Sequence, residues 1–322
     1  MQELLRVKNL SVHVAHRGRP VSLIDDISFR IKKGSMFAMF GESGCGKTTL
    51  ALALTKLFSN GNNFSIQGKI NINGSDILEL SDEKLLSLRR DHIRYVFQDP
   101  VQSFNPVMKI NKQIYHALNL KTKSDRRRET PKIREFLSKS GIENPDEVLR
   151  SYPHQLSVGM LQRILIVMAI FPAPALLIAD EPTSSVDAAL RYRILDFLDE
   201  MRRTLGMSIL LITHDLEVVR RYADEVAVMY AGRLVEVAPR EKFFDEPYHP
   251  YAQLLMEHFF KPGNIDADAL QSLTGTVPSP LDTPQGCTFQ NRCYKVQSDC
   301  KIEEPPLTEV NPERFVRCPY WK

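Results

Sequence analysis

The sequence has few of the features that mark secreted, membrane-spanning or nucleic-acid-binding proteins. Only five of its 322 residues are cysteine and one is tryptophan, while 42 Lys and Arg nearly balance 39 Asp and Glu, giving a formal net charge of +3. So small a net charge gives no electrostatic reason to expect nucleic acid or an anionic membrane surface as a partner. The 43% of hydrophobic residues is ordinary for a globular protein and argues against widespread disorder.

Long apolar runs are also missing. The most apolar stretch, residues 164–179, is broken by Pro172 and Pro174. It is also shorter than the roughly 20 residues that a membrane-crossing helix needs. The first ten residues lack an apolar segment with a small-residue cleavage site, so they do not resemble a signal peptide. We therefore expect a cytosolic chain without transmembrane helices, in which any membrane role comes through a partner.

Short apolar segments separated by helix-like stretches predict an α/β fold with a mainly parallel sheet covered on both faces. The expected strands of this sheet are residues 35–40, 93–97, 175–179 and 208–213. Alternating apolar residues at 4–14 and 67–77, with Asn73-Gly74 as a hairpin signal, predict an antiparallel region near the N-terminus. Residues 226–230 and 233–237, joined at Ala231-Gly232, favour a closing hairpin.

Composition divides the chain into a first domain over 1–238 and a C-terminal extension over 239–322. Eleven of the 20 prolines fall from residue 239 onward, so we expect a separate, loop-rich unit there. Within the first domain, residues 105–160 have helical periodicity and many charges, which predicts an inserted helical subdomain. Its basic run at 121–129 is interpreted as a solvated helix face, with an anionic partner as the alternative.

The segment GESGCGKT at 41–48 fits the pattern G-x-x-x-x-G-K-[ST] between an expected strand and an expected helix. Its glycines let the backbone curl so that N–H groups point at phosphate oxygens, and the helix N-terminus adds attraction. Lys47 would reach the β- and γ-phosphates and the Thr48 hydroxyl would bind Mg²⁺. The predicted nucleotide-binding residues of this segment are Gly41, Ser43, Gly44, Cys45, Gly46, Lys47, Thr48 and Thr49. Cys45 is interpreted as a small filler, with an oxidation-sensitive thiol as the alternative.

Two further expected strands end in chemically useful side chains. Residues 175–179 lead into Asp180 and Glu181, at the strand end where open α/β sheets bind ligands. Asp180 is the candidate Mg²⁺ ligand, and Glu181 is placed to accept a proton from a water that attacks the γ-phosphate. His214 ends another expected strand at the same edge. A purely structural role remains the alternative for the carboxylate pair and for the histidine.

The order of these motifs resembles the nucleotide-binding subunit of an ATP-binding cassette (ABC) transporter. Beyond GESGCGKT and LLIADE, the sequence has VFQDP at 96–100, LSVGM at 156–160 before a helix, Ser185-Val186-Asp187 and ITHD at 212–215. The resemblance covers residues 1 to about 238. It implies a P-loop NTPase fold with an antiparallel β subdomain, an inserted helical subdomain, and two subunits that face each other head to tail around two ATP molecules.

The resemblance also implies roles for single residues. Gln98 would sense the γ-phosphate and the Mg²⁺ ion and link the site to the helical subdomain. Ser157 and Gly159 would cap the ATP of the partner subunit, and Asp187 would lie at the dimer seam. His214 would hold the γ-phosphate and the attacking water, which Glu181 polarises.

The sequence departs from the family pattern at two places. Val158 replaces a glycine and Met160 replaces a common glutamine, so the signature segment is either a tolerated variant or a displaced loop that makes the two ATP sites unequal. The family often stacks adenine on an aromatic residue before the P-loop, but residues 12–24 contain none. His16 or Arg17 would substitute for it.

The tail resembles the C-terminal extension of oligopeptide and dipeptide importer ATPases. The residues that carry this likeness are PYHPY at 247–251, the Pro pair at 305–306, and Cys287, Cys293, Cys300 and Cys318. In relatives with these cysteines the extension can carry a [4Fe-4S] cluster, and four thiolates suit one. Zinc suits the same ligands, although the gaps of five, six and seventeen residues lack the usual zinc knuckles. Unmetallated thiols or disulfides are the third alternative.

These features predict an ATPase subunit that powers peptide uptake through an ABC importer, bound peripherally at the cytoplasmic face of the cell (inner) membrane. The expected partners are two transmembrane permease subunits, a homologous ATPase subunit in a heterodimer, and an extracytoplasmic substrate-binding protein, with no nucleic acid. A homodimer, a weakly hydrolysing scaffold subunit, and another cargo such as nickel or cationic peptides remain alternatives.

Overall fold

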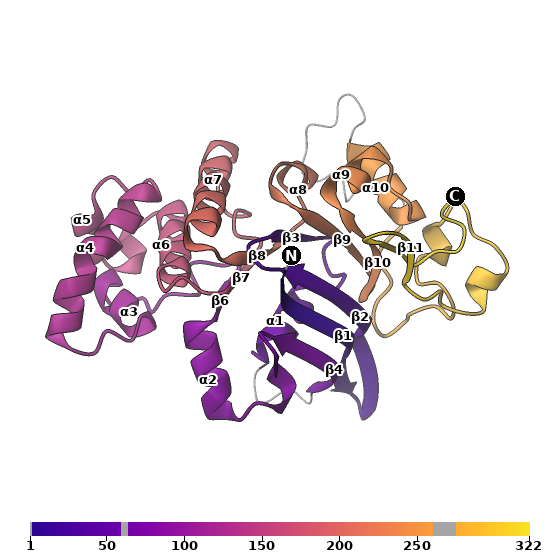
Figure 1. Ribbon diagram of the computed structural model, residues 1–322, viewed down its shortest axis with the longest axis horizontal. Helices are drawn as coiled ribbons and strands as arrows, with labels where there is room; N and C mark the ends of the chain where they lie inside the picture. The colour runs from indigo at the N-terminus through magenta and orange to yellow at the C-terminus, as the bar shows by residue number, and fades with distance from the viewer. Residues whose placement is uncertain (1, 59–63, 260–274) are drawn as a thin grey trace. The chain divides into compact units, whose positions relative to one another are not determined.

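The computed structural model describes residues 2–58, 64–259 and 275–322. The chain forms two compact units (Figure 1). The first unit comprises Met1–Leu80 and Leu210–Lys322, and the second comprises Ser81–Ile209. Among the described residues, no helix is both long and apolar enough to cross a membrane.

The first unit begins with the expected antiparallel sheet, in the strand order β2-β1-β4-β5. Its strands are β1 (Glu3–His16), β2 (Arg19–Lys32), β4 (Phe64–Ile72) and β5 (Ser75–Asp76), followed by the 3₁₀ turn η1 (Ile77–Glu79). The Asn73-Gly74 hairpin forms as predicted, with φ angles of 49° and 87° that suit a tight primed turn. The sequence did not predict β2, which pairs with β1 along nearly its whole length.

The same unit contains the strands β11-β12-β10-β9-β3-β8 in that order. These are β3 (Met36–Phe40), β8 (Ser208–Thr213), β9 (Glu225–Tyr230), β10 (Arg233–Pro239), β11 (Thr308–Asn311) and β12 (Arg314–Val316), with the unit boundary falling inside β8. Every residue of β3 and β9 is buried, and these two strands run parallel. Its helices are α1 (Lys47–Thr55), α8 (Leu216–Tyr222), α9 (Arg240–Asp245) and α10 (Pro250–Phe259), with 3₁₀ turns η4 (Gln290–Arg292) and η5 (Asp299–Lys301).

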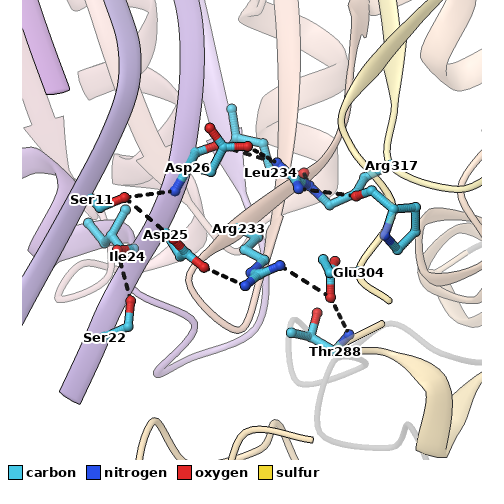
Figure 2. Close-up of polar contacts among 11 residues, drawn as sticks. Ser11, Ser22, Ile24, Asp25, Asp26, Arg233, Leu234, Thr288, Glu304 and Arg317 are labelled. Carbon is cyan, nitrogen blue, oxygen red and sulfur yellow. Dashed lines mark hydrogen bonds and ion pairs between the residues drawn. The ribbon is translucent and has the colours of Figure 1, made fainter. Parts of the chain in front are cut away.

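The C-terminal extension is joined to the sheets by strands and by buried arginines. Besides the loops that the sequence predicts, the extension contains two short strands: β12 pairs with β10 and β11 pairs with β12. Figure 2 shows Arg233 between Asp25 and Glu304, and Arg317 reaching Asp26 and the carbonyl of Leu234. The extension is therefore a packed part of the first unit, because its charged side chains bind both sheets of that unit.

The second unit pairs two parallel strands, β6 (Ile93–Val96) and β7 (Leu176–Asp180), with a set of helices. The helices are α2 (Asp82–Asp91), α3 (Ile110–Ala117), α4 (Lys123–Lys139), α5 (Pro145–Arg150), α6 (Val158–Ile170) and α7 (Ala188–Leu205), with the 3₁₀ turn η2 (Pro153–Gln155). Helices thus occupy the range in which the sequence predicts a helical subdomain. The basic run forms the capped, exposed start of α4, as the solvated-helix interpretation expects.

Candidate functional site

The glycine-rich segment 41–46 joins β3 to α1, as the sequence predicts. Gly46 is the N-cap of α1 with φ of 107°, and it offers no side-chain cap to the first N–H groups of the helix. Ser43, Gly44 and Thr48 are exposed around this helix end. Uncapped N–H groups at the positive end of a helix form an anion-binding arrangement, so the loop is suited to phosphate.

Two glycines of the loop are needed for different reasons. A Cβ atom at Gly41 would lie 2.3 Å from the carbonyl oxygen of Met229 in β9, so close packing against backbone excludes a larger residue there. A Cβ atom at Gly46 would lie 2.9 Å from Cε of the same methionine, the flexible end of a side chain, and 3.2 Å from the carbonyl oxygen of Leu23. At Gly46 the left-handed φ of 107° is the stronger reason for glycine.

Lys47 lies across the loop. Its side chain is buried, and its Nζ donates to the carbonyl oxygens of Gly41 at 2.7 Å and Glu42 at 2.9 Å. Cys45 is 1% exposed, and burial raises the pKa of its thiol. A neutral, enclosed thiol matches the small-filler interpretation, since a reactive cysteine needs accessible thiolate.

Two residues of the C-terminal extension contact this loop, and the sequence did not identify either as functional. Arg292 binds the Glu42 carboxylate at 3.0 Å, and the Tyr251 hydroxyl accepts from the Glu42 N–H at 3.2 Å. The only local signals were that Arg292 directly precedes Cys293 and that Tyr251 belongs to the PYHPY segment. Their link to Glu42 spans more than 200 positions, so no sequence window contains it.

His214 follows β8, which neighbours β3 in the sheet, so the P-loop and His214 follow adjacent strands of one unit. The next residue, Asp215, caps α8 by accepting from the N–H groups of Glu217 at 2.9 Å and Val218 at 3.2 Å. This cap fixes the turn in which half-buried His214 lies. The phosphate-binding role of His214 stays a prediction.

In the second unit, the predicted carboxylate pair ends β7. Asp180 is 2% exposed, and the Tyr95 hydroxyl on β6 donates to its Oδ2 at 2.8 Å. Burial, followed by the charge of Asp180, raises the pKa of Tyr95, so the phenol remains a donor. Glu181 has φ of 48°, a left-handed conformation that costs a non-glycine residue about 1 kcal/mol. Nine other non-glycine residues of the described ranges also have a positive φ, so this conformation does not by itself identify a catalytic residue, and the role of Glu181 stays a prediction.

Gln98 follows β6 in an exposed segment of the same unit. The ring of Phe97 lies 4.4 Å from the ring of Tyr95, and the Asp99 carboxylate accepts from the N–H groups of Val101 and Gln102. Gln98 thus lies between an aromatic contact and an Asx turn that set the course of the backbone.

The signature segment forms the start of α6. Ser157 is its N-cap and accepts from the N–H of Met160 at 3.3 Å. Val158 is the first helical residue, 41% exposed, and does not have a positive φ, so its β-branched side chain imposes no backbone strain there. The backbone at Val158 therefore does not support the alternative that this residue displaces the signature loop. Gly159 packs closely, because a Cβ atom there would lie 2.8 Å from Leu190 Cδ2.

Asp187 is the N-cap of α7, and its Oδ1 accepts from the N–H of Leu190 at 2.9 Å. It is exposed, and its predicted place at a dimer seam stays a prediction. Of the candidate adenine contacts, His16 is the exposed last residue of β1, and Arg17 lies in the exposed turn that joins β1 to β2.

The four cysteines of the extension are near one another but do not make a formed metal site. Burial, with further contributions from neighbouring thiols, raises the pKa of Cys287 to about 12 and that of Cys318 to about 11. The N–H of Cys287 donates to the carbonyl of Cys300 at 2.7 Å. Across the described ranges, no three His, Cys, Asp or Glu side chains are arranged to hold a metal ion. The predicted [4Fe-4S] cluster is therefore not supported by this arrangement.

The geometry of the loop at residues 41–47 defines a class of nucleotide-binding protein. A glycine-rich loop that joins a buried strand to an uncapped helix N-terminus, with a lysine lying across it, is the arrangement of P-loop nucleotide-binding α/β proteins. The sequence matches the ABC transporter family over residues 24–184 and the C-terminal region of oligopeptide/dipeptide transporters over residues 235–300. The chain belongs to the ABC transporter family.

Individual relatives align over nearly the whole chain. The oligopeptide transport ATP-binding protein AppD of Bacillus subtilis (strain 168) is 36% identical over 323 residues, which cover 99% of this chain and 97% of AppD. The dipeptide transport ATP-binding protein DppD of Escherichia coli (strain K12) is also 36% identical, over 98% of this chain and 96% of its own length.

Solved structures show the same fold. CbiO1 from Clostridium perfringens, part of the ABC transporter complex CbiONQ, aligns with a TM-score of 0.63 at 27% identity, over 81% of this chain and 97% of CbiO1. The dimeric bacterial ABC transporter cassette MJ0796 aligns with a TM-score of 0.65 at 23% identity, over 74% of this chain and 99% of that one. These alignments confirm the predicted fold class.

Proposed function

We propose that this chain is the ATP-hydrolysing subunit of an ABC importer for di- or oligopeptides. One observation carries the proposal: a P-loop cassette and an oligopeptide/dipeptide-type C-terminal region occur on one chain, and relatives named as peptide transport ATP-binding proteins align with nearly all of it. The cassette match supports ATP binding, and the match of the extension to oligopeptide/dipeptide transporters supports peptides as the cargo.

Each predicted residue has a distinct task in the proposed reaction. Lys47 and the loop N–H groups would bind and orient the phosphates, and Thr48 and Asp180 would each offer an oxygen ligand of the kind that Mg²⁺ prefers. Bound Mg²⁺ would supply charge neutralisation at the phosphates. Glu181 holds and deprotonates the attacking water, while His214 orients it, so that catalysis is mainly positioning and charge stabilisation.

The proposed assembly places the chain peripherally at the cytoplasmic face of a membrane. Two transmembrane permeases, a homologous ATPase subunit and an extracytoplasmic binding protein would complete it. Ser157 and Gly159 would face the ATP of the second ATPase, and Gln98 would relay the nucleotide state toward the permeases. The regular backbone at Val158 supports a competent signature segment over a scaffold role.

Replacement of the proposed water-holding carboxylate tests the enzymatic part. In the assembled transporter, Glu181→Gln should nearly abolish ATP turnover while MgATP still binds. Glu200→Gln, an exposed substitution of the same kind on α7, is the matched control and should retain wild-type turnover. Unchanged turnover in Glu181→Gln would instead support the scaffold alternative.

Two experiments test the identity of the cargo: identification of the proteins that co-purify with the chain, and transport assays with the purified complex. The proposal predicts permeases and a binding protein that sustain ATP-dependent uptake of labelled di- or oligopeptides. Uptake of nickel without uptake of peptides would contradict the peptide assignment.

We also propose that the four C-terminal cysteines bind a soft metal, a [4Fe-4S] cluster or zinc. Support comes from the donor chemistry and from thiols near enough to raise one another's pKa. Anaerobic purification with iron and zinc analysis and an absorption spectrum is the test. About four irons per chain or one zinc would support the proposal, and substoichiometric metal would refute it.

A further inference from the structure

Glu42 places a carboxylate in the loop that is suited to phosphate, and a carboxylate repels phosphate oxygens. It lies between the two glycines of the P-loop pattern and is only 9% exposed. Water therefore screens its charge poorly, and a buried carboxylate needs a partner. The structure provides that partner from the far end of the chain.

Arg292 neutralises Glu42 in the interior of the first unit. Its Nη1 donates to Oε1 at 3.0 Å and to Oε2 at 3.2 Å, and both side chains are nearly buried, at 7% and 11% exposure. The same nitrogen donates to the Tyr230 hydroxyl at 3.3 Å. The arginine thus offsets the one negative charge within the phosphate loop.

The backbone of Glu42 is bound as firmly as its side chain. Its N–H donates to the hydroxyl of Tyr251, which is fully buried, and its carbonyl accepts from Lys47 Nζ at 2.9 Å. Glu42 therefore connects the extension to the lysine that is predicted to meet the phosphates. A shift of Glu42 would move Lys47 and the loop together.

Arg292 is itself held by an aromatic cluster, defined here as Tyr230, Tyr251 and Phe289. The ring centroids of this cluster lie 4.7 to 5.2 Å apart, and the guanidinium lies 5.6 Å from the Tyr230 ring and 5.9 Å from the Phe289 ring. Phe289 and Arg292 belong to the segment between Cys287 and Cys293, and both cysteines pack against the core that contains this cluster. The fold of the cysteine-rich segment therefore sets the position of the arginine.

From this arrangement, and resting on the proposed function, we infer that Arg292 is a positioning residue for ATP binding. Through Glu42 it cancels a buried charge inside the P-loop and fixes the loop and Lys47 in the phosphate-binding conformation. The C-terminal extension is thus part of the nucleotide site, in addition to any role in assembly.

Calorimetry of MgATP binding to the full-length chain tests the inference. Arg292→Gln should raise the Kd at least tenfold, because it leaves the Glu42 carboxylate buried and uncompensated. Arg292→Lys, which keeps the positive charge but loses the planar guanidinium, should raise the Kd less. In the assembled transporter, Arg292→Gln should raise KM for ATP far more than it lowers kcat, as expected for a residue that positions the binding loop.

Two further variants separate positioning from simple destabilisation. The Glu42→Gln and Arg292→Gln substitutions together should raise the Kd less than Arg292→Gln alone, since no buried charge is then left unpaired. Arg317→Gln removes another buried arginine of the extension, one that binds Asp26 and not the P-loop. It should lower stability yet keep the Kd within twofold of wild type.

The inference is overturned if folded Arg292→Gln binds MgATP within twofold of wild type, or if Arg317→Gln weakens binding equally. If Arg292→Gln does not fold, Tyr251→Phe provides a second test. It removes the other hydrogen bond between the extension and Glu42 at nearly constant side-chain volume. It should raise the Kd at least threefold, and a wild-type Kd would overturn the inference. Wild-type protein that binds no MgATP would instead contradict the proposed function, so the two failures are distinguishable.

Discussion

The close approach of the P-loop to β9 leads to a strong prediction for Gly41→Ala. The new Cβ atom would lie 2.3 Å from the Met229 carbonyl oxygen, more than 1 Å shorter than an ordinary contact of 3.4 to 4 Å. Neither atom can rotate away, because the Cβ position is fixed by the backbone of residue 41 and the oxygen belongs to the backbone of Met229. Met229 lies in a strand that pairs with β3 on one side and β10 on the other, so relief requires displacement of the loop.

The expected cost is about 3 kcal/mol, at the upper end for overpacked interiors. With a urea slope of about 3 kcal/mol/M, this cost lowers the unfolding midpoint by about 1 M. Because the loop is displaced, the affinity for MgATP should also fall at least tenfold in Gly41→Ala.

Gly206→Ala is the matched control. Gly206 has φ of 67° but its Cβ would meet nothing within 4 Å, so only backbone strain of about 1 kcal/mol is expected, with MgATP affinity unchanged. If Gly41→Ala and Gly206→Ala had equal stabilities and equal nucleotide affinities, the close-packing argument for the P-loop would be wrong.

Three further predictions follow from single contacts. Tyr95→Phe removes the hydroxyl that donates to buried Asp180, so stability should fall by about 1 to 3 kcal/mol in urea titrations, and an unchanged midpoint would contradict the hydrogen bond. Ser157→Ala removes the α6 cap and should cost about 1 kcal/mol, whereas Ser157→Asp, which can also cap, should recover most of it. Burial lowers the pKa of His249 to about 3 from an ordinary 6.5, and its Nδ1 accepts a hydrogen bond from the Tyr251 N–H. As the pH falls, His249 is therefore protonated in the unfolded chain before it is protonated in the folded one. The free energy of unfolding should therefore fall by about 4 kcal/mol between pH 6.5 and pH 3, because the folded state holds the neutral ring. His249→Gln should lack this pH dependence.

The sequence could predict the elements whose signals are local. The P-loop, the buried strands around it and the β9–β10 hairpin each depend on residues within one short window, and all are present in the structure. Strand β2 was missed because its pairing with β1 contains register shifts, with Asp26 at φ of 50°, which interrupt the alternation of apolar and polar residues.

Other features depend on partners that are distant in the sequence. Strand β12 is only three residues long, and besides its neighbour β11 it pairs with β10, about 80 positions earlier. The contact of Arg292 with Glu42 spans 250 positions. Local patterns cannot encode such pairs, so the sequence predicted the phosphate loop itself but not the extension residues that hold it.

Every role proposed for the residues above depends on binding of a nucleoside triphosphate by the loop at residues 41–48. Isothermal titration of the full-length chain with MgATP, with Lys47→Ala as the comparison, measures this binding. We expect one ATP per wild-type chain and a loss of at least a hundredfold in affinity for Lys47→Ala. Equal affinity in the two proteins, or no binding to folded wild-type protein, would show that the loop does not bind nucleotide in the way proposed.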